Sequence, residues 1–465
     1  MTPTSILFGY GVLGLCLVLP SVASSYVMST VMGMTPSEMT TVAVWCSLPW
    51  VTKPLWGAVS DHCAMCGYRR RPYVCLFSLL AAASLAATPY YAAAKTRGMM
   101  IFTLFCTSAA LCVMDVALDG SLMVLVKGEK KGTKDEGKSQ THSWMARVAG
   151  GCMGSGWSGL VYEWGGIEWV CYICAAICLV LSVVALDIPD DTAAEQSSDR
   201  GLRTPSHTCA VTGALWAFVR HTKFVLLAAV IVGIVPEIGT AQFFYLLSAD
   251  ATPVSLSYID LAGSCASFLS LCLYSLLKPS HRLSFFFGVL LNAVACTLGA
   301  LLTSDSVPWL VPMACAEAVV GAVGSTLCLL PVITLLGHAA SRSRYESTLY
   351  SAGLSVLNAA SVVSESVAGL AMRRLHIASG DTDNIRRFVG VVAAITFLLT
   401  PVALLFPRTS RRAERAHDPE DHELVPLKAP SEASFSLECS ESSSEEEEVV
   451  FDRERDVLNA PLPCV

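Results

Sequence analysis

The chain has 465 residues, of which 53% are hydrophobic and 15% are charged, and its mean hydropathy is +0.55. A soluble domain cannot bury this much apolar surface, so the composition excludes a soluble enzyme or a soluble binding module. The formal net charge of −7 gives no reason to expect a nucleic-acid partner. The sequence therefore predicts an all-α protein that is embedded in a membrane.

Twelve apolar runs follow one another along the chain, each near the length of about 20 residues that crosses a hydrocarbon core. The runs are residues 4–25, 38–59, 73–94, 98–126, 142–162, 167–186, 223–247, 254–277, 283–302, 307–336, 345–372 and 388–406. They form two sets of six, which predicts an N-terminal bundle over residues 1–187 and a C-terminal bundle over residues 223–406. Residues 188–222 are expected to form a cytosolic linker, and the acidic residues 407–465 a disordered cytosolic tail.

Lysine and arginine are divided unevenly between the expected loops on the two sides of the membrane. With a cytosolic N-terminus, the inside loops hold 20 of these residues and the outside loops hold 6. Positive residues favour the cytosolic side, so both termini are expected in the cytosol, with the plasma membrane as the expected location. Two six-helix sets with a cytosolic linker are typical of two parallel repeats that share a central site.

Four ionisable residues lie inside the apolar runs of the first half. At about 1.5 Å per residue from the cytosolic helix ends, Lys53 and Asp119 lie about 12 Å deep, Arg147 about 8 Å and Asp115 about 18 Å. Charges at such depth are costly, so each is a candidate functional residue. Asp115 and Asp119 share a helix face and repel unless a cation lies between them or one takes up a proton. The cluster is either a substrate site or inner gate, or a structural ion-pair network between three helices.

Two tryptophans accompany the embedded lysine. Trp50 and Trp56 lie three residues on either side of Lys53, so one broad helix face is expected to carry the lysine between two indole rings. Such a face suits a flat heterocycle with a carboxylate, because aromatic rings stack on heterocycles and attract cations. The alternative is that both tryptophans pack against neighbouring helices.

The second half carries embedded acids without embedded cations. Glu237, Asp260, Glu317 and Glu365 lie within its apolar runs, and no lysine or arginine is found in the interior of these runs. A carboxyl group at low dielectric without a cation tends to hold its proton, which makes Glu237, Glu317 and Glu365 candidates for proton coupling. Glu237 follows Pro236, where the helix is expected to break and an unwound segment to line a cavity. Alternatively, Glu317, Glu365 and Asp260 are neutral side chains that are hydrogen-bonded between helices.

Several motif matches do not occur in the structural context that their chemistry needs. Residues 132–139 match the phosphate-loop pattern, but they fill a loop between two spanning helices rather than the turn after a strand, so no ATP site is expected. Residues 9–14 and 154–159 match the dinucleotide fingerprint inside membrane helices, where small residues instead allow close helix packing. Cys63 and Cys66 face no second pair of ligands. No metal or cofactor is therefore expected.

The stretch from Pro49 to Tyr73 resembles two nested families. The residues that resemble the signature loop between the second and third helices of the major facilitator superfamily, which implies a gating loop, are Gly57, Asp61, Gly67, Arg69, Arg70 and Arg71. The string Pro49-Trp50-x-x-Lys53-Pro54-x-x-Gly57 with Gly67-Tyr68-Arg69-Arg70-Arg71-Pro72-Tyr73 is similar to the folate-biopterin transporter family within that superfamily. Asp115-Val116-x-x-Asp119 and Glu346-x-Thr348-Leu349-Tyr350 with Ser355-x-x-Asn358 resemble later motifs of the same family.

This resemblance implies a secondary active transporter, not an enzyme, that moves folate or pterins such as biopterin and is coupled to protons. Lys53 and Arg147 are then the candidate partners of folate's carboxylates, and Trp50, Asp115 and Asp119 complete the expected substrate site. The alternatives are a transporter of another solute, such as S-adenosylmethionine, or a protein of this fold that senses a solute without moving it. The expected partners are a small anionic heterocycle, protons and membrane lipid.

Overall fold

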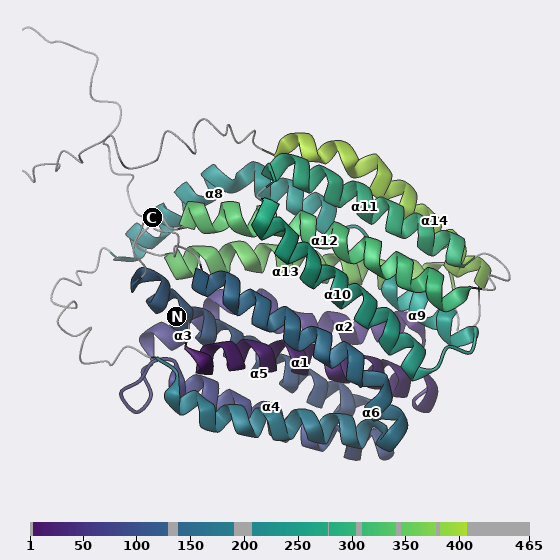
Figure 1. The fold of residues 1–465 in the computed structure, drawn as a ribbon, viewed down its shortest axis with the longest axis horizontal. Coiled ribbons are helices and arrows are strands. Elements are labelled where there is room, and N and C mark those ends of the chain that lie inside the picture. Colours follow the sequence, from purple (N-terminus) through teal and green to yellow (C-terminus); the bar gives the residue numbers. More distant parts are fainter. Residues whose placement is uncertain are drawn as a thin grey trace, which may run out of the picture. The chain divides into compact units, whose positions relative to one another are not determined.

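The computed structural model describes residues 3–128, 138–189, 207–277, 279–303, 309–340, 346–377 and 382–406, which are mostly helical (Figure 1). The helices of the first half are α1 (Thr4–Tyr26), α2 (Pro36–Val51), α3 (Lys53–His62), α4 (Arg71–Ala93), α5 (Arg97–Gly128) and α6 (Lys138–Val184). Those of the second half are α8 (His207–Gly233), α9 (Gly239–Ser248), α10 (Pro253–Leu277), α11 (His281–Leu302), α12 (Leu310–Ala340), α13 (Glu346–Arg374) and α14 (Thr382–Leu399).

Ten stretches of the described chain are helical, long and apolar enough to cross a membrane. α6 counts as one of these, but its backbone leaves the helical conformation at Gly165 and Gly166, and its two arms each make one crossing. α2 and α3 follow one another across Thr52 and together make one further crossing. The described part of the chain therefore makes twelve crossings, as the sequence predicted.

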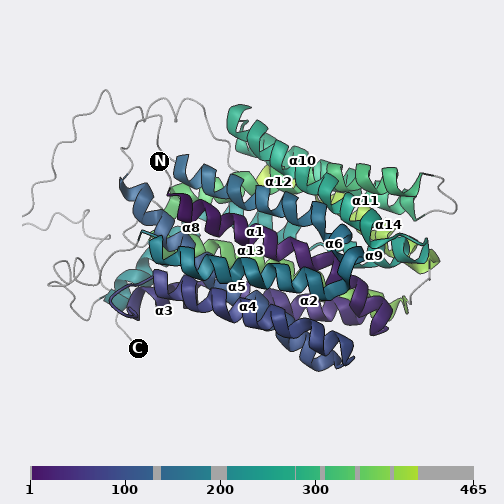
Figure 2. The same ribbon diagram turned by 60° about the horizontal axis from the view of Figure 1, so that its bottom comes forward.

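Helices α1 to α6 pack together and helices α8 to α14 pack together, as the sequence colours show in Figures 1 and 2. One cluster of buried side chains, with Leu13 and Met114 among them, forms the core of the first half. Two clusters, around Leu302 and around Phe285, form the core of the second half. α8 begins at His207, so residues 207–222, which were expected in the linker, are helical. The expected acidic tail at residues 407–465 lies outside the described residues.

The crossing made by α2 and α3 is broken by proline. In a continuous helix the carbonyl of Trp50 would accept the N–H of residue 54, but Pro54 has no N–H to donate. Asn358 of α13 supplies a donor instead, and its Nδ2 lies 2.9 Å from the Trp50 carbonyl oxygen. A side chain of the second half thus completes the hydrogen bonding of a helix in the first half.

A second break separates α8 from α9, with Pro236 in the gap between them. The N–H of Gly239 donates to Glu237 Oε1 at 2.5 Å and not to the carbonyl of Val235. That carbonyl accepts the hydroxyl of Ser364 on α13 at 2.6 Å. The break expected at Pro236 is confirmed, and α13 supplies the missing donor at both breaks.

Glycines allow α1 to lie directly against the first arm of α6. A Cβ added at Gly14 would lie 1.9 Å from the carbonyl oxygen of Arg147, and one added at Gly150 would lie 2.0 Å from that of Gly11. Both distances are far shorter than van der Waals contact, so any larger residue would push the helices apart. The interpretation of the glycine-rich segments as close helix packing is therefore confirmed.

The two halves meet along a seam that is formed by α2 with α13 and by the first arm of α6 with α10. In the first contact, Ser47 Oγ donates to Glu365 Oε1 at 3.2 Å. In the second, the hydroxyls of Ser155 and Ser264 lie 2.8 Å apart, and the Ser257 hydroxyl donates to the Ser155 carbonyl at 2.9 Å. Small hydroxyl side chains therefore bring the halves into direct polar contact.

Candidate functional site

Lys53, Asp115 and Arg147 form a buried ionic cluster where α3, α5 and α6 meet. The ammonium group of Lys53 contacts Asp115 Oδ2, and Arg147 Nη1 lies 2.5 Å from Asp115 Oδ1. Asp115 is fully buried and Lys53 is 5% exposed, so water screens these charges little. One carboxylate thus holds two cations, one on each oxygen. The three groups together carry one positive charge in excess.

The indole ring of Trp50 lies within reach of both cations. Lys53 Nζ is 4.9 Å and the guanidinium of Arg147 is 5.7 Å from the centre of this ring, which is within the range of cation–π attraction. The indole N–H donates to Ser108 Oγ at 3.0 Å and so fixes the ring. Trp144 is a second ring in contact with Arg147, at 5.6 Å. The cations are therefore combined with aromatic faces that suit a flat ligand.

Asp119 lies one turn along α5 from Asp115 and has a different partner. Tyr10 of α1 donates its hydroxyl to Asp119 Oδ1 at 2.5 Å. Both cations contact Asp115, so the repulsion between the two carboxylates is relieved at one end by cations and at the other by a phenol. The two cations and the two carboxylates of Asp115 and Asp119 balance in charge, so no charge of this cluster is buried without an opposite one.

Trp56 does not join this cluster. Its indole N–H donates to Thr52 Oγ1 at 3.1 Å, and its ring packs against Phe77 of α4 with 6.2 Å between ring centres. The break at Thr52 explains this position, because the angular spacing of one continuous helix does not extend across it. The expected face with Lys53 between two tryptophans was therefore wrong, and Trp56 packs against a neighbouring helix.

Two of the candidate proton-coupling residues bond within the second half. Glu237 caps the start of α9 by accepting the N–H of Gly239. Glu317 of α12 accepts Nε2 of Gln242 on α9 at 2.5 Å. Gly299 of α11 leaves room for this pair, since a Cβ there would lie 2.2 Å from the same Nε2. Both carboxyl groups therefore hold α9 in its place, in addition to any role with protons.

The third candidate reaches the other half of the protein. Glu365 of α13 accepts Ser47 of α2 across the seam, and it also interacts electrostatically with Glu237. Glu365 thus connects the acids of the second half with the helix that leads to Lys53. Asp260, by contrast, is exposed on α10.

The expected gating loop is a tight turn between α3 and α4. Cys66 and Gly67 both have positive φ, 54° and 82°, and the residues on either side exchange two backbone hydrogen bonds of 2.9 and 3.0 Å. This is a two-residue turn of type I′, which strongly favours glycine at its second position. Gly57 faces α5 at ordinary contact distance, and the side chain of Asp61 lies outside the described residues.

The arginines that follow this turn lie against the ends of neighbouring helices. A Cβ added at Gly120 of α5 would come within 2.5 Å of Arg70 Nε, so the Arg70 side chain lies directly on that helix. Arg71 Nε donates to the carbonyl of Ile188 after α6, and Arg69 is buried. The loop is therefore packed onto the first half, and its role in gating stays a prediction.

Four side chains that complete these sites were missed as site residues from the sequence: Tyr10, Ser108, Gln242 and Asn358. Each is a polar residue within an apolar run, and a search that included uncharged polar residues would have found all four. Among the described residues, no group of three or more histidine, cysteine or acidic side chains is placed to hold a metal ion.

Comparison of the sequence with known proteins gives matches along most of the chain. Residues 13–424 match the sequence profile of the BT1 family. The chain is 24% identical over 431 residues to the folate-biopterin transporter of Synechocystis sp., which covers 90% of this chain and 84% of that protein. Over 98 residues it is 33% identical to probable folate-biopterin transporter 2 of Arabidopsis thaliana, which covers 21% of this chain and 19% of that protein.

Solved structures of two transporters have the same fold as this chain. A variant of the nucleoside transporter NupG superposes with a TM-score of 0.64 at 13% identity, over 86% of this chain and 99% of that chain. A D-xylose-proton symporter superposes with a TM-score of 0.64 at 11% identity, over 88% of this chain and 98% of that chain. The fold is therefore of the major facilitator type, as the sequence analysis expected.

Proposed function

Since the chain belongs to the BT1 family, we propose that it is a secondary active transporter that moves folate or pterins, biopterin among them, across a membrane. The observation that carries this proposal is the buried cluster in which Lys53, Arg147 and Trp50 meet around Asp115. The relatives are folate-biopterin transporters and the structural neighbours are transporters, which supports transport and not an enzymatic activity.

The cluster offers the two kinds of interaction that folate can make. Folate combines a flat heterocycle with carboxylates, and the cluster combines aromatic faces with two cations. A substrate carboxylate that displaces Asp115 from Arg147 leaves no cation without a partner. Folate carries its carboxylates at the opposite end from its heterocycle, so one end of the molecule occupies the cluster at a time. Biopterin has no carboxylate, and its ring N–H groups would be accepted by Asp115 while the ring lies against Trp50 and Trp144.

Protons are the proposed coupling ion, and Glu365 is the proposed site at which protonation acts on the seam. As a carboxylate, Glu365 accepts the hydroxyl of Ser47 in a charge-assisted hydrogen bond, and protonation weakens that bond. A change in this contact biases the equilibrium between closed and separated halves. Glu237 and Glu317 remain candidate proton carriers behind it, because Glu237 interacts with Glu365.

Both termini are proposed to lie in the cytosol of a cell whose plasma membrane holds the protein, in accord with the uneven division of lysine and arginine. Cys63 and Cys66 are exposed within the gating loop and so provide a test of this orientation. A membrane-impermeant maleimide that is added to intact cells should leave both thiols unlabelled and should label them after permeabilisation. Labelling without permeabilisation would reverse the proposed orientation.

Uptake of labelled folic acid into vesicles, with and without a pH gradient, tests the function directly. We expect the gradient to accelerate uptake, and we expect Lys53→Gln or Lys53→Leu to abolish it. Lys223→Gln is a matched control, because Lys223 is an exposed lysine over Phe224 of α8, away from the cluster. Undiminished uptake of folate and biopterin by the Lys53 variants would show that the site is wrongly assigned. If the unaltered protein binds folate but does not take it up, the alternative function is favoured, in which the protein senses a solute without moving it.

Glu365→Gln tests the coupling separately from the binding site. The variant should bind folate and exchange it across the vesicle membrane, but a pH gradient should no longer accelerate its uptake. Asp260→Asn is the comparison, since Asp260 is an exposed acid of the second half that is not among the candidate coupling residues. An unchanged response of Glu365→Gln to the gradient would remove Glu365 from the coupling mechanism.

A further inference from the structure

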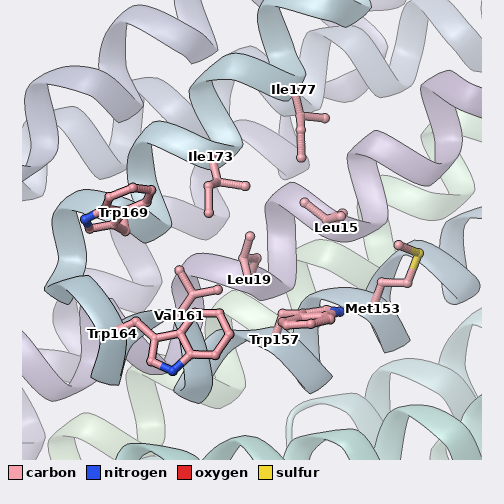
Figure 3. Close-up of a pocket in the computed structure, with 9 residues that line it drawn as sticks. All are labelled: Leu15, Leu19, Met153, Trp157, Val161, Trp164, Trp169, Ile173 and Ile177. Carbon is pink, nitrogen blue, oxygen red and sulfur yellow. The ribbon is translucent and has the colours of Figure 1, made fainter.

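A cavity of about 310 Å³ lies between α1 and the two arms of α6 (Figure 3), and none of its lining residues belongs to the ionic cluster. It is lined by Leu15, Leu19, Met153, Trp157, Val161, Trp164, Trp169, Ile173 and Ile177. Every one of these side chains is apolar apart from the indole N–H groups. The volume is about twice that of the roughly 150 Å³ apolar cavity that holds a benzene-sized ligand. The site therefore suits a hydrocarbon of considerable length.

The cavity opens on the outer surface of the helix bundle. Trp164 is 74% exposed, Trp169 61%, Met153 58% and Trp157 51%, although all four line it. In a protein that crosses a membrane, an exposed surface of this composition is in contact with lipid. The cavity is thus continuous with the lipid-facing surface, and lipid is what surrounds its mouth.

The lining residues form one stripe on each of three helical segments. On the first arm of α6 they recur every three or four residues from Met153 to Trp164, and on the second arm every four residues from Trp169 to Ile177. Figure 3 shows Trp164 and Trp169 at one end of the cavity and Met153 and Ile177 at the other. The eleven steps from Met153 to Trp164 span about 16 Å along the helix. The cavity is therefore a long groove that runs parallel to the helices.

One end of the groove lies at the turn between the two arms of α6, where a polar headgroup would sit. Tryptophans at such a position are typical of the membrane interface. The exposed carboxylates Glu163 and Glu168 flank the turn, and residues 150–185 contain no lysine or arginine. An anionic headgroup would be repelled there. A headgroup with a quaternary ammonium would instead be attracted by the carboxylates and the indole faces.

We propose that this groove binds one acyl chain of a zwitterionic phospholipid, with its choline-type headgroup at the α6 turn. The chain fills a groove that runs in the direction of the lipid tails and that contains almost no polar atom to be left without a partner. Leu15 and Leu19 of α1 line the groove. They lie close to Gly14, which packs against the backbone of Arg147. A bound chain therefore supports the helix contact that positions one cation of the ionic cluster.

Photolabelling in nanodiscs tests the proposal on the full-length protein. The probe is a phosphatidylcholine with a diazirine near the end of one acyl chain, and mass spectrometry locates the labelled peptides. We expect peptides from residues 153–177 to be labelled at least fivefold more than the exposed leucines at the end of α10, such as Leu273 and Leu276. Ile173→Trp, which fills the groove, should abolish this excess, whereas Leu179→Trp on the outward face of the same arm should keep it.

Three results would overturn the proposal. The first is equal labelling of all lipid-facing helices, which indicates annular lipid only. The second is equal or stronger labelling of the groove by the corresponding phosphatidylglycerol probe, and the third is labelling by a photoactivatable sterol that displaces the phosphatidylcholine. Size-exclusion profiles that match the unaltered protein establish that both tryptophan variants are folded. Lipid retention is read without substrate, so failure here is distinct from failure of the proposed folate transport.

Discussion

Replacement of Asp115 and of Asp119 by asparagine gives two isosteric changes, one turn apart, with very different expected costs. Asp115→Asn removes the carboxylate that Lys53 and Arg147 share and leaves excess positive charge in a buried site. Breaking a buried ion pair in this way costs about 3–5 kcal/mol, so about 4 kcal/mol is expected. Asp119→Asn leaves the same net charge, but it breaks neither ion pair and converts the charged hydrogen bond from Tyr10 into a neutral one, at a cost of roughly 1 kcal/mol.

Thermal unfolding measures this difference. Each half of the protein is comparable in size to a domain of 150–250 residues, for which 1 kcal/mol shifts the melting temperature by about 2–4 °C. Asp115→Asn should therefore melt about 8–16 °C lower than the unaltered protein, and Asp119→Asn about 2–4 °C lower. A fluorogenic thiol reagent reports the transition, because several cysteines are buried in the core of the first half.

A double variant separates a structural cost from a functional one. Asp115→Asn combined with Lys53→Met leaves Arg147 and Asp119, so the cluster is again neutral. The double variant should regain more than half of the lost melting temperature and still take up no folate, because one cation for the substrate is gone. Equal melting temperatures for the two asparagine variants would show that the ion pairs of Asp115 stabilise the protein no more than the hydrogen bond of Asp119 does. Transport by the double variant would refute the substrate role of Lys53.

Three further predictions concern helix packing and the seam. Gly14→Leu should prevent assembly of folded protein, because even a Cβ cannot fit against α6, whereas Gly98→Leu, which faces open space, should give a normal yield in a fluorescence size-exclusion assay. Asn358→Ala should lower the free energy of unfolding by about 1–3 kcal/mol in thermal unfolding, because a carbonyl of α2 loses its donor. Cys152 of α6 and Cys265 of α10 flank the contact between Ser155 and Ser264 at the seam, so a mild oxidant should cross-link them and stop uptake until a reductant is added, whereas Cys152→Ser should be insensitive.

The outcomes that would contradict these three predictions are equally specific. Normal yield of Gly14→Leu would mean that α1 and α6 do not touch as described. An unchanged melting temperature of Asn358→Ala would mean that water or another group serves the α2 carbonyl as well. Uptake that continues after complete cross-linking of Cys152 and Cys265 would mean that the halves do not separate at α6 and α10 during transport.

The number of crossings could be predicted from the sequence because each crossing needs a run of apolar residues that is read directly from the chain. The embedded charges could be identified for the same reason. Their pairing could not, because spacing places Asp115 and Asp119 on one face without saying what faces each of them. Tyr10 reaches Asp119 because α1 also lies against α5, where a Cβ added at Gly9 would come within 3.0 Å of the Leu118 side chain.

The error at Trp56 has a similar cause. A count of residues treats the second crossing as one helix, in which Trp50 and Trp56 flank Lys53. Pro54 removes the donor that would continue that helix, and the rotation across Thr52 sends Trp56 towards α4. Prolines therefore limit how far helical periodicity can be used to place side chains in this protein.

Asn358 completes the hydrogen bonding of a helix to which it does not belong, and this has a consequence for hydration. Whenever α13 withdraws from α2, the Trp50 carbonyl gives up its amide donor at a depth where lipid and apolar side chains offer none. An acceptor without a donor in such surroundings costs about 1–3 kcal/mol. We therefore expect water to follow the retreating amide, so that any separation of α13 from α2 admits water beside Trp50.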